Sequence, residues 1–212
     1  MAATPLLAAL AVIVSGLQAS DVKLHVDDSK RLSRAEPSVG IGLTDSATGE
    51  PGPWEIWAAL ASDYRPQTGS PGVSGRIALA RKFGRYVRPE LQVGTGAYLG
   101  DKQTMTLIRL GVRAELPLRT ITPYLYGALA HQHEMAFEDA KVNPFGSVLG
   151  LSGHGEIHRS GTDLGAGFLL NLPRSERDPA QARIGLRVSW LYLLGDGPPH
   201  AIDAVLSVGV GF

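Results

Sequence analysis

The stretch that decides the fold is "HAIDAVLSVGVGF", which runs from His200 to Phe212. Large apolar residues alternate there with small or polar ones, and a period of two residues is typical of a β-strand whose two faces differ. The apolar face consists of Ile202, Ala204, Leu206, Val208, Val210 and Phe212. The opposite face consists of Asp203, Val205, Ser207, Gly209 and Gly211. The sequence therefore predicts a strand with one bulky apolar face and one narrow face that carries an acid.

The same alternation of apolar with small or polar residues recurs from Pro53 to the end of the chain. Clusters of Gly, Pro, Asn and Asp separate the alternating segments. Such a series is typical of strands joined by turns, and no segment between them has the apolar spacing of an amphipathic helix. The predicted strands are Trp54–Tyr64, Val73–Phe83, Arg88–Gly100, Met105–Pro117, Pro123–Glu134, His158–Leu172, Arg183–Leu194 and Ala201–Phe212. Residues 53–212 are thus expected to form an all-β, eight-stranded antiparallel up-and-down β-barrel. A further strand over Ser38–Asp45 would raise the strand count.

The two faces of the predicted strands have opposite character. In the fourth strand, Ile108 and Leu110 share one face, while Arg109 and Arg113 share the other. A soluble lipocalin-like barrel encloses its apolar face, whereas a membrane barrel turns that face toward lipid. A narrow eight-stranded interior suits glycines and charges that can pair, so we expect a polar network inside a transmembrane barrel. The members of this network are Arg76, Glu90, Arg109, Arg113, Glu115, Asp163 and Arg187.

Aromatic residues and turn lengths favour the membrane barrel. Such barrels carry aromatic girdles at both edges of the apolar band, with short turns at one end and longer loops at the other. One girdle is expected from Trp54, Phe83, Tyr86, Tyr124, Tyr126 and Phe212, and the second from Tyr64, Tyr98, Trp190 and Tyr192. The connection from Met135 to Ile157 is the longest, and we expect it outside the cell as the main interaction surface. The soluble lipocalin-like binding barrel is the alternative.

The charge balance and the cysteine count exclude several classes of protein. The chain has 212 residues, with 20 basic and 20 acidic side chains. It therefore lacks the broad positive surface that nucleic-acid binding needs. Because it contains no cysteine, disulfides and thiolate metal sites are excluded. The glycine-rich segments are not followed by the Gly-Lys-Ser/Thr arrangement of a phosphate cradle, and we expect no cofactor.

The first 52 residues differ from the rest in their pattern of apolar and charged residues. Residues 1–20 contain an apolar run from Leu6 to Val14 followed by small residues, which predicts a secretory signal peptide. This run is too short to span a bilayer as a helix. Residues 21–52 are rich in charges and turn formers, and we expect them to form an N-terminal extension that precedes the barrel.

The end of the chain and an earlier stretch, "GTDLGAGFLLNL" from Gly161 to Leu172, carry a family resemblance. In "AVLSVGVGF" the alternation closes on Phe212, and residues from Trp54 onward resemble the small outer-membrane β-barrel proteins of Gram-negative bacteria. The resemblance implies export to the outer membrane and contact with its lipid and lipopolysaccharide. It also implies that the barrel assembly machinery recognises Phe212. We therefore predict a non-enzymatic barrel with a structural, binding or adhesion role through its external loops.

Histidines gather at the end expected to be external, which raises the hypothesis of a metal or proton site. His131 and His133 are two residues apart and share a strand face, and His158 begins the next strand. Glu134 and Glu156 would be additional ligands. Successive side chains of a strand point to opposite faces. If the girdle tyrosines of the fifth strand point outward, His131 and His133 point inward. The alternation of the sixth strand predicts that His158 points toward lipid. The alternative is a set of polar residues at a wet rim.

A second hypothesis concerns hydrolysis. His158 and Ser160 form an H-x-S pair that resembles the lipid A deacylase family, small barrels whose membrane-facing His and Ser hydrolyse an acyl chain. The resemblance implies that Ser160 is the nucleophile and His158 the base. A third group must orient the base, and Glu134, expected on the outside, is the candidate. That family has Asn after the Ser, where this chain has Gly161, so oxyanion stabilisation lacks its usual source.

Overall fold

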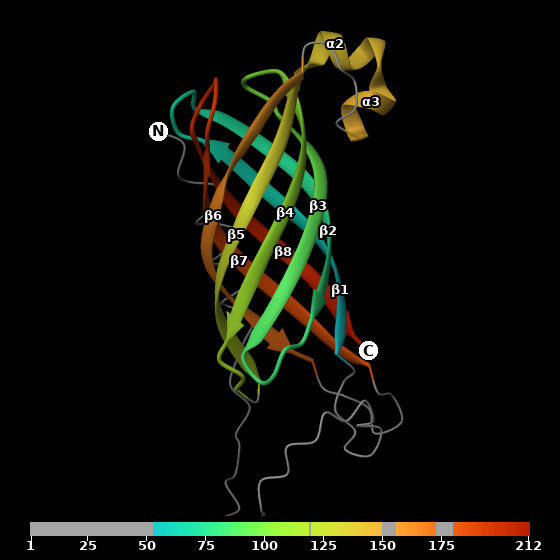
Figure 1. The fold of residues 1–212 in the computed structure, drawn as a ribbon, viewed down its shortest axis with the longest axis vertical. Coiled ribbons are helices and arrows are strands. Elements are labelled where there is room, and N and C mark those ends of the chain that lie inside the picture. The colour runs from blue at the N-terminus through green and yellow to red at the C-terminus, as the bar shows by residue number, and fades with distance from the viewer. Residues whose placement is uncertain (1–52, 119, 150–155, 173–179) are drawn as a thin grey trace, which may run out of the picture. The chain divides into compact units, whose positions relative to one another are not determined.

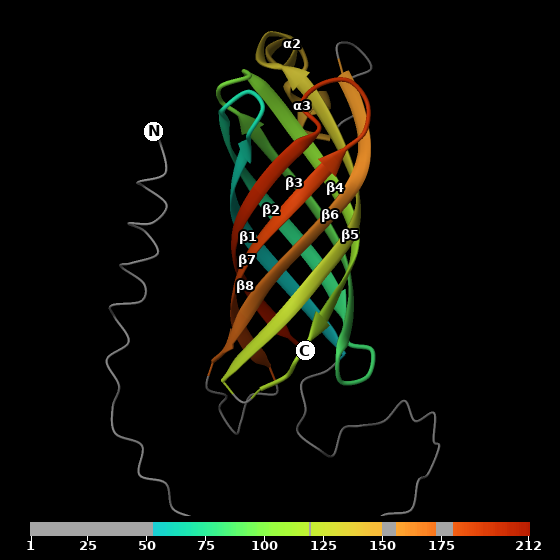
Figure 2. The same cartoon turned by 90° about the vertical axis from the view of Figure 1, so that its left-hand side faces the viewer.

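The computed structural model describes residues 53–118, 120–149, 156–172 and 180–212. The strands in this part of the chain close into one antiparallel barrel of eight, in which each strand pairs with its sequence neighbours and β1 pairs with β8 (Figures 1 and 2). The strands are β1 Trp54–Arg65, β2 Ser70–Arg81, β3 Val87–Tyr98, β4 Gln103–Glu115, β5 Ile121–Ala136, β6 Glu156–Asn171, β7 Gln181–Leu193 and β8 His200–Gly211. The predicted up-and-down barrel is confirmed, and the predicted strand ends differ from these bounds by only a few residues.

The barrel has two different ends. At the terminal end, the backbone N–H of Phe212 donates to the carbonyl of Trp54 at 2.9 Å, and the N–H of Trp54 donates back at 3.2 Å. The loop end carries the turns 66–69, 99–102 and 194–199 and the connection between β5 and β6. The predicted signal peptide, the N-terminal extension and the further strand over Ser38–Asp45 lie outside the described residues.

Two short helices of the β5–β6 connection lie at the loop end (Figure 1). They are α2, Phe137–Val142, and α3, Pro144–Leu149. The side chain of Asn143 accepts a hydrogen bond from the N–H of Gly146 at 2.9 Å, which caps the start of α3. The hydroxyl of Thr106 on β4 donates to the carbonyl of Val148 at 2.8 Å and ties α3 to the barrel wall. Within the described ranges, no helix has the length and apolar character needed to cross a membrane.

The barrel wall is apolar on the outside and ionic on the inside. Leu60, Leu125 and Leu129 on the outer face are 68%, 68% and 67% exposed, whereas Arg109 on the inner face is 1% exposed. The alternation of exposed and buried positions runs along the strands and places their bulky aliphatic side chains outside. A lipocalin-like barrel requires these leucines inside, and the structure places them outside. This inverted arrangement is that of a transmembrane β-barrel.

The aromatic residues divide between the outer surface and the interior. Exposed rings mark both ends of the outer surface, namely Trp54, Phe83, Tyr86 and Phe212 at the terminal end and Tyr64, Trp190 and Tyr192 at the loop end. The expected membership of Tyr98, Tyr124 and Tyr126 in these girdles is wrong, because their rings are buried inside the barrel. The physical reason is their stacking on enclosed guanidinium groups. Arg65 lies 3.6 Å from the ring centre of Tyr98, and Arg187 lies 3.9 Å from that of Tyr126.

Glycines on the inner face make room for two large rings. A Cβ atom at Gly209 would overlap the indole of Trp57, and one at Gly167 would overlap the phenol of Tyr124. Both rings belong to a buried apolar cluster that also contains Ala78 and Leu169. Each ring lies directly beside its glycine, because Trp57 is the register partner of Gly209 and Tyr124 that of Gly167. The narrow face noted in the sequence of β8 is therefore narrow because the adjacent strand β1 supplies the volume.

A charge on the outer wall tests the orientation of the barrel. Leu110 lies in the middle of β4 and is 62% exposed, and Leu118 lies in the turn at the terminal end and is 54% exposed. We expect Leu110→Arg to lower the free energy of unfolding in lipid vesicles by about 2–4 kcal/mol, because the charge enters hydrocarbon, and Leu118→Arg to cost about 0–1 kcal/mol. Urea titration of both variants in vesicles measures the difference. Equal losses would contradict the orientation.

Candidate functional site

The middle of the barrel interior holds a central ion cluster of Asp63, Arg76, Arg109, Asp163 and Asp203. Asp203 accepts hydrogen bonds from Arg76 at 2.7 Å and from Arg109 at 2.6 Å. Arg109 also pairs with Asp163 at 2.9 Å, and Arg76 pairs with Asp63. These residues come from β1, β2, β4, β6 and β8. The cluster therefore connects strands across the whole width of the barrel.

A second group, the terminal ion cluster, fills the interior near the terminal end. Its members are Glu55, Arg88, Glu90, Arg113, Glu115, Arg183 and Arg187. Arg113 lies at its centre and contacts Glu55 at 2.5 Å and Glu115 at 2.8 Å. Arg183 on β7 approaches Glu55 on β1 at 3.2 Å. These ion pairs also join strands that are not neighbours, because Arg113 on β4 and Arg183 on β7 both reach Glu55 on β1.

A third group, the loop-end ion cluster, contains Arg65, Asp101, Glu134 and Arg159. Glu134 pairs with Arg65 and, at 3.1 Å, with Arg159. Arg159 also donates to the carbonyl of Pro198 at 2.7 Å, so the cluster reaches the turn between β7 and β8. The expected outward position of Glu134 is wrong, because its carboxylate is 1% exposed and lies inside the barrel.

The three clusters share the interior with buried apolar side chains such as Trp57, Leu169 and Leu191. Together they hold as many carboxylates as guanidinium groups, so the enclosed charge is balanced. An internal hollow beside Glu90, Gln92 and Arg113 measures about 20 Å³, room for roughly one water molecule. The interior therefore has the chemistry of an ionic core.

All seven residues proposed from the sequence for the interior network are buried members of these clusters: Arg76, Glu90, Arg109, Arg113, Glu115, Asp163 and Arg187. The sequence interpretation missed the other members, which are Glu55, Asp63, Arg65, Arg88, Asp101, Glu134, Arg159, Arg183 and Asp203. Strand parity could have found most of them, because Asp63 shares a face with Trp57 and Asp203 shares a face with Gly209. Asp101 lies in a turn, where parity gives no information.

The outer face at the loop end carries a histidine cluster of His131, His133 and His158. His131 and His133 lie on β5, and His158 on β6 is the register partner of His133. The ring centres of His131 and His133 are 4.6 Å apart, and those of His133 and His158 are 4.3 Å apart. The predicted inward direction of His131 and His133 is wrong. The parity was reversed because it rested on Tyr124 and Tyr126, whose rings lie inside.

Two polar side chains of β6 bond the ring nitrogens of this cluster. Ser160 Oγ lies 3.0 Å from Nδ1 of His131, and Glu156 Oε1 lies 2.8 Å from Nδ1 of His133. The other oxygen of Glu156 lies 3.8 Å from Nε2 of His158. The Glu156 side chain is 4% exposed and that of His158 is 54% exposed. The cluster is thus supported from the protein side and open on its outer side.

The arrangement differs from the hydrolase triad suggested by the sequence. Ser160 bonds His131 on the neighbouring strand, whereas His158 was expected to be its base. The nearby carboxylate, Glu156, bonds His133. The serine and the carboxylate therefore contact different histidines, and Glu134 is enclosed with Arg65. A base held by its own carboxylate, as a serine nucleophile requires, is not formed by Ser160, His158 and Glu134.

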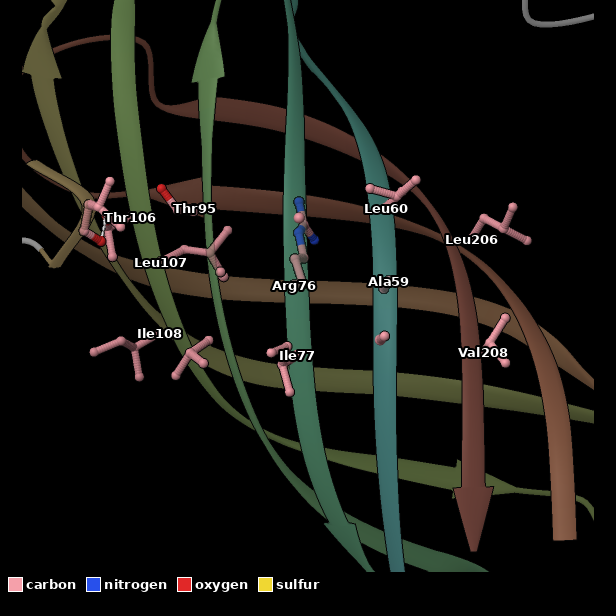
Figure 3. Close-up of a pocket in the computed structure, with 15 residues that line it drawn as sticks. Ala59, Leu60, Arg76, Ile77, Thr95, Thr106, Leu107, Ile108, Leu206 and Val208 are labelled. Atoms are coloured by element: carbon pink, nitrogen blue, oxygen red, sulfur yellow. Dashed lines mark hydrogen bonds between the residues drawn. The ribbon is translucent and has the colours of Figure 1, made fainter. Parts of the chain in front are cut away.

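The outer wall also has an apolar hollow of about 860 Å³ over β1 to β4 and β8 (Figure 3). Leu60, Ile77 and Leu206 lie around it, as Figure 3 shows. Gly75 contributes to the hollow because a Cβ atom there would meet open space. The lining is dominated by aliphatic side chains, so its surface matches hydrocarbon and not a polar ligand.

Strand closure and the direction of the apolar side chains define the class of protein: a small eight-stranded membrane β-barrel. In fold the chain is similar to Neisserial surface protein A, with 12% identity over 75% of this chain and 96% of that chain and a TM-score of 0.49. It is also similar to Ail of Yersinia pestis, with 8% identity, coverage of 76% and 97%, and a TM-score of 0.42. The outer membrane enzyme PagL matches with 12% identity, coverage of 73% and 97%, and a TM-score of 0.43. No protein family and no curated protein matches the sequence.

Removal of one central arginine tests the energetic importance of the interior. Arg109 pairs with Asp163 and Asp203 and is 1% exposed, so Arg109→Met leaves the buried Asp163 without this arginine and removes one of the two arginines at Asp203. We expect a loss of about 3–5 kcal/mol in the free energy of unfolding. The matched variant, Arg85→Met in an exposed turn, should change it by about 0.5 kcal/mol or less. Urea titration in detergent measures both, and similar losses would show that the central ion cluster is not important for stability.

Proposed function

We propose that the protein is an integral β-barrel of the Gram-negative outer membrane, without enzymatic activity, whose loop end binds partners outside the cell. The observation that carries this proposal is the inverted wall, in which Leu60 and Leu125 are exposed while Arg109 is enclosed. In water such an outer surface would drive association. In a bilayer it is stable, because a closed barrel satisfies every backbone hydrogen bond between its own strands.

The filled interior supports a structural or binding role over transport. The ion pairs of Arg109 and Arg113 reach across the barrel, and an eight-stranded barrel is narrow enough for side chains to fill. A solute would have to break several buried ion pairs at once. The function is therefore assigned to the outer surface and the loop end.

The environment of the wall suggests its partners. The hollow bordered by Leu60 and Leu206 would be occupied by acyl chains of outer-membrane lipid, and the loop end would lie among lipopolysaccharide headgroups. Val142 on α2 is 87% exposed and Val148 on α3 is 50% exposed. These two helices belong to the connection between Met135 and Ile157. Val148 lines the apolar hollow, so it is the exposed Val142 that supports a role of this connection as the binding surface.

The proposal of no enzymatic activity rests on the separation of the polar groups at the loop end. Ser160 and Glu156 contact different histidines, so the serine lacks a base oriented by a carboxylate. The amide that would follow the serine in a deacylase is replaced by Gly161, which removes an oxyanion donor.

Membrane fractionation and gel mobility test the proposal. We expect the full chain, expressed with its own leader in a Gram-negative host, to sediment with the outer membrane. Unboiled samples should migrate differently from boiled ones, because a closed barrel keeps its structure in cold detergent. Recovery in the soluble periplasmic fraction, with no change of mobility on boiling, would contradict the membrane assignment and support a soluble barrel.

The terminal aromatic residue allows a test of assembly. The backbone of Phe212 pairs with Trp54 while its ring is 54% exposed, so Phe212→Ala keeps the strand pairing. We expect this variant to reach the outer membrane at a level at least several-fold lower, because the assembly machinery reads the ring. The purified barrel should refold with nearly unchanged stability. Phe168→Ala removes another exposed ring, 45% exposed on β6, and serves as the control. Equal levels of the two variants would exclude a signal at Phe212.

A further inference from the structure

We propose that His131, His133 and His158 form a binding site for a divalent transition metal of the zinc class on the outer face of the barrel. His131 and His133 are two residues apart on β5, so their side chains leave the strand on one face. His158 is the register partner of His133 on β6. Two histidines on one strand and a third directly across the sheet bring three imidazoles to one point of the wall.

The distances are close to those of a bound metal. One nitrogen of each histidine can be chosen so that all three lie within 4.8 Å of one another. Nitrogen ligands around a tetrahedral zinc, bonded at about 2.0–2.1 Å, lie about 3.3 Å apart. The side chains must therefore close by roughly 1.5 Å, which small rotations about their χ angles can supply. His158 is 54% exposed, so its ring has space to make this movement.

The neighbouring polar groups match the outer shell of a metal site. Nδ1 of His131 faces Ser160 at 3.0 Å, and Nδ1 of His133 faces Glu156 at 2.8 Å. A hydrogen bond at Nδ1 fixes the ring and its tautomer, and it leaves Nε2 as the atom that coordinates. A carboxylate that holds a ligating histidine in this way is a recurrent feature of zinc sites. Ser160 and Glu156 thus act as positioning residues for two of the three ligands.

The donor set selects the class of metal. Three imidazoles and a nearby carboxylate suit zinc and its neighbours among the first-row metals, and they are poor ligands for magnesium or calcium. Three protein ligands leave one coordination position open to water. The site would also join β5 to β6 immediately before the connection that carries α2 and α3, and so would hold the base of that connection.

Metal titration of the full-length barrel, purified without a histidine tag and refolded in detergent, tests the site. We expect one equivalent of Zn²⁺ to bind by calorimetry, and Co²⁺ to give the intense visible absorption of a tetrahedral complex. His131→Ala, His133→Ala and His158→Ala should each weaken Zn²⁺ binding at least 100-fold. Glu156→Gln and Ser160→Ala should weaken it about 10–100-fold, the range for outer-shell partners.

His200→Ala is the matched control. His200 lies at the same end of the barrel, where its ring packs on Trp190 and Tyr192, away from the cluster. We expect this variant to bind Zn²⁺ as the unmodified protein does. Because these side chains lie on the outer surface, all variants should keep the mobility difference between boiled and unboiled samples, which verifies folding.

Several results would overturn the proposal. These are no Zn²⁺ binding by the folded protein, a Co²⁺ spectrum of octahedral intensity, or equal losses in His200→Ala and His131→Ala. Hydrolysis of an acyl ester that persists in a chelator and disappears in Ser160→Ala would instead assign the Ser160–His131 pair to catalysis. Failure of zinc binding alone leaves the outer-membrane proposal intact, because that proposal is tested by fractionation and by gel mobility.

Discussion

The structure depends on the enclosure of charge within a closed, narrow sheet. Closure satisfies the backbone of each strand by its neighbours, which is the condition for crossing hydrocarbon. With only eight strands, the enclosed volume is small and must be filled by side chains. Arginine and carboxylate groups placed there are removed from bulk water, so each must find partners inside the barrel. The ion pairs of Arg76, Arg109 and Arg113 provide these partners, and they also connect strands that are not neighbours in the sheet.

The fold could be predicted because most strands have unambiguous faces. In β4 the alternation of Leu110 with Arg109 separates the two faces at once, and in β8 the contrast between Leu206 and Gly209 does the same. In β5 both faces carry bulky residues, since Leu125 lies between Tyr124 and Tyr126. The usual preference of tyrosine for the membrane interface therefore gave the wrong parity. The tyrosines are inside because guanidinium groups and inner-face glycines provide a place for their rings, and this depends on strands far away in sequence.

The error of parity in β5 determined what could be predicted of the candidate site. Reversal of β5 placed His131 and His133 inside and Glu134 outside, which separated the histidines from His158 and brought the wrong carboxylate to Ser160. The spacing of His131 and His133 correctly predicted that the two side chains lie on the same face of β5. The pairing of His133 with His158, and of Ser160 with His131, follows from the register of β5 against β6, which alternation alone does not determine. A carboxylate such as Glu156, at the start of a strand, is placed by that same register.

The two faces of β5 separate the ion pairs of the interior from the proposed metal site. Gln132 and Glu134 point inward, where the amide of Gln132 donates to the carboxylate of Glu134 at 2.8 Å and the glutamate also pairs with arginines. His131 and His133 alternate with them and point outward, where no ion pair of the core depends on them. Substitutions on the outer face can therefore alter binding while the barrel remains closed. A ligand site on this face lies where the strands leave the apolar band, above Leu129, and so meets both the headgroup region and the base of the loop. The inverted wall makes the proposed site possible, because the bulky apolar face points outward and its edge at the loop end is accessible from outside the barrel.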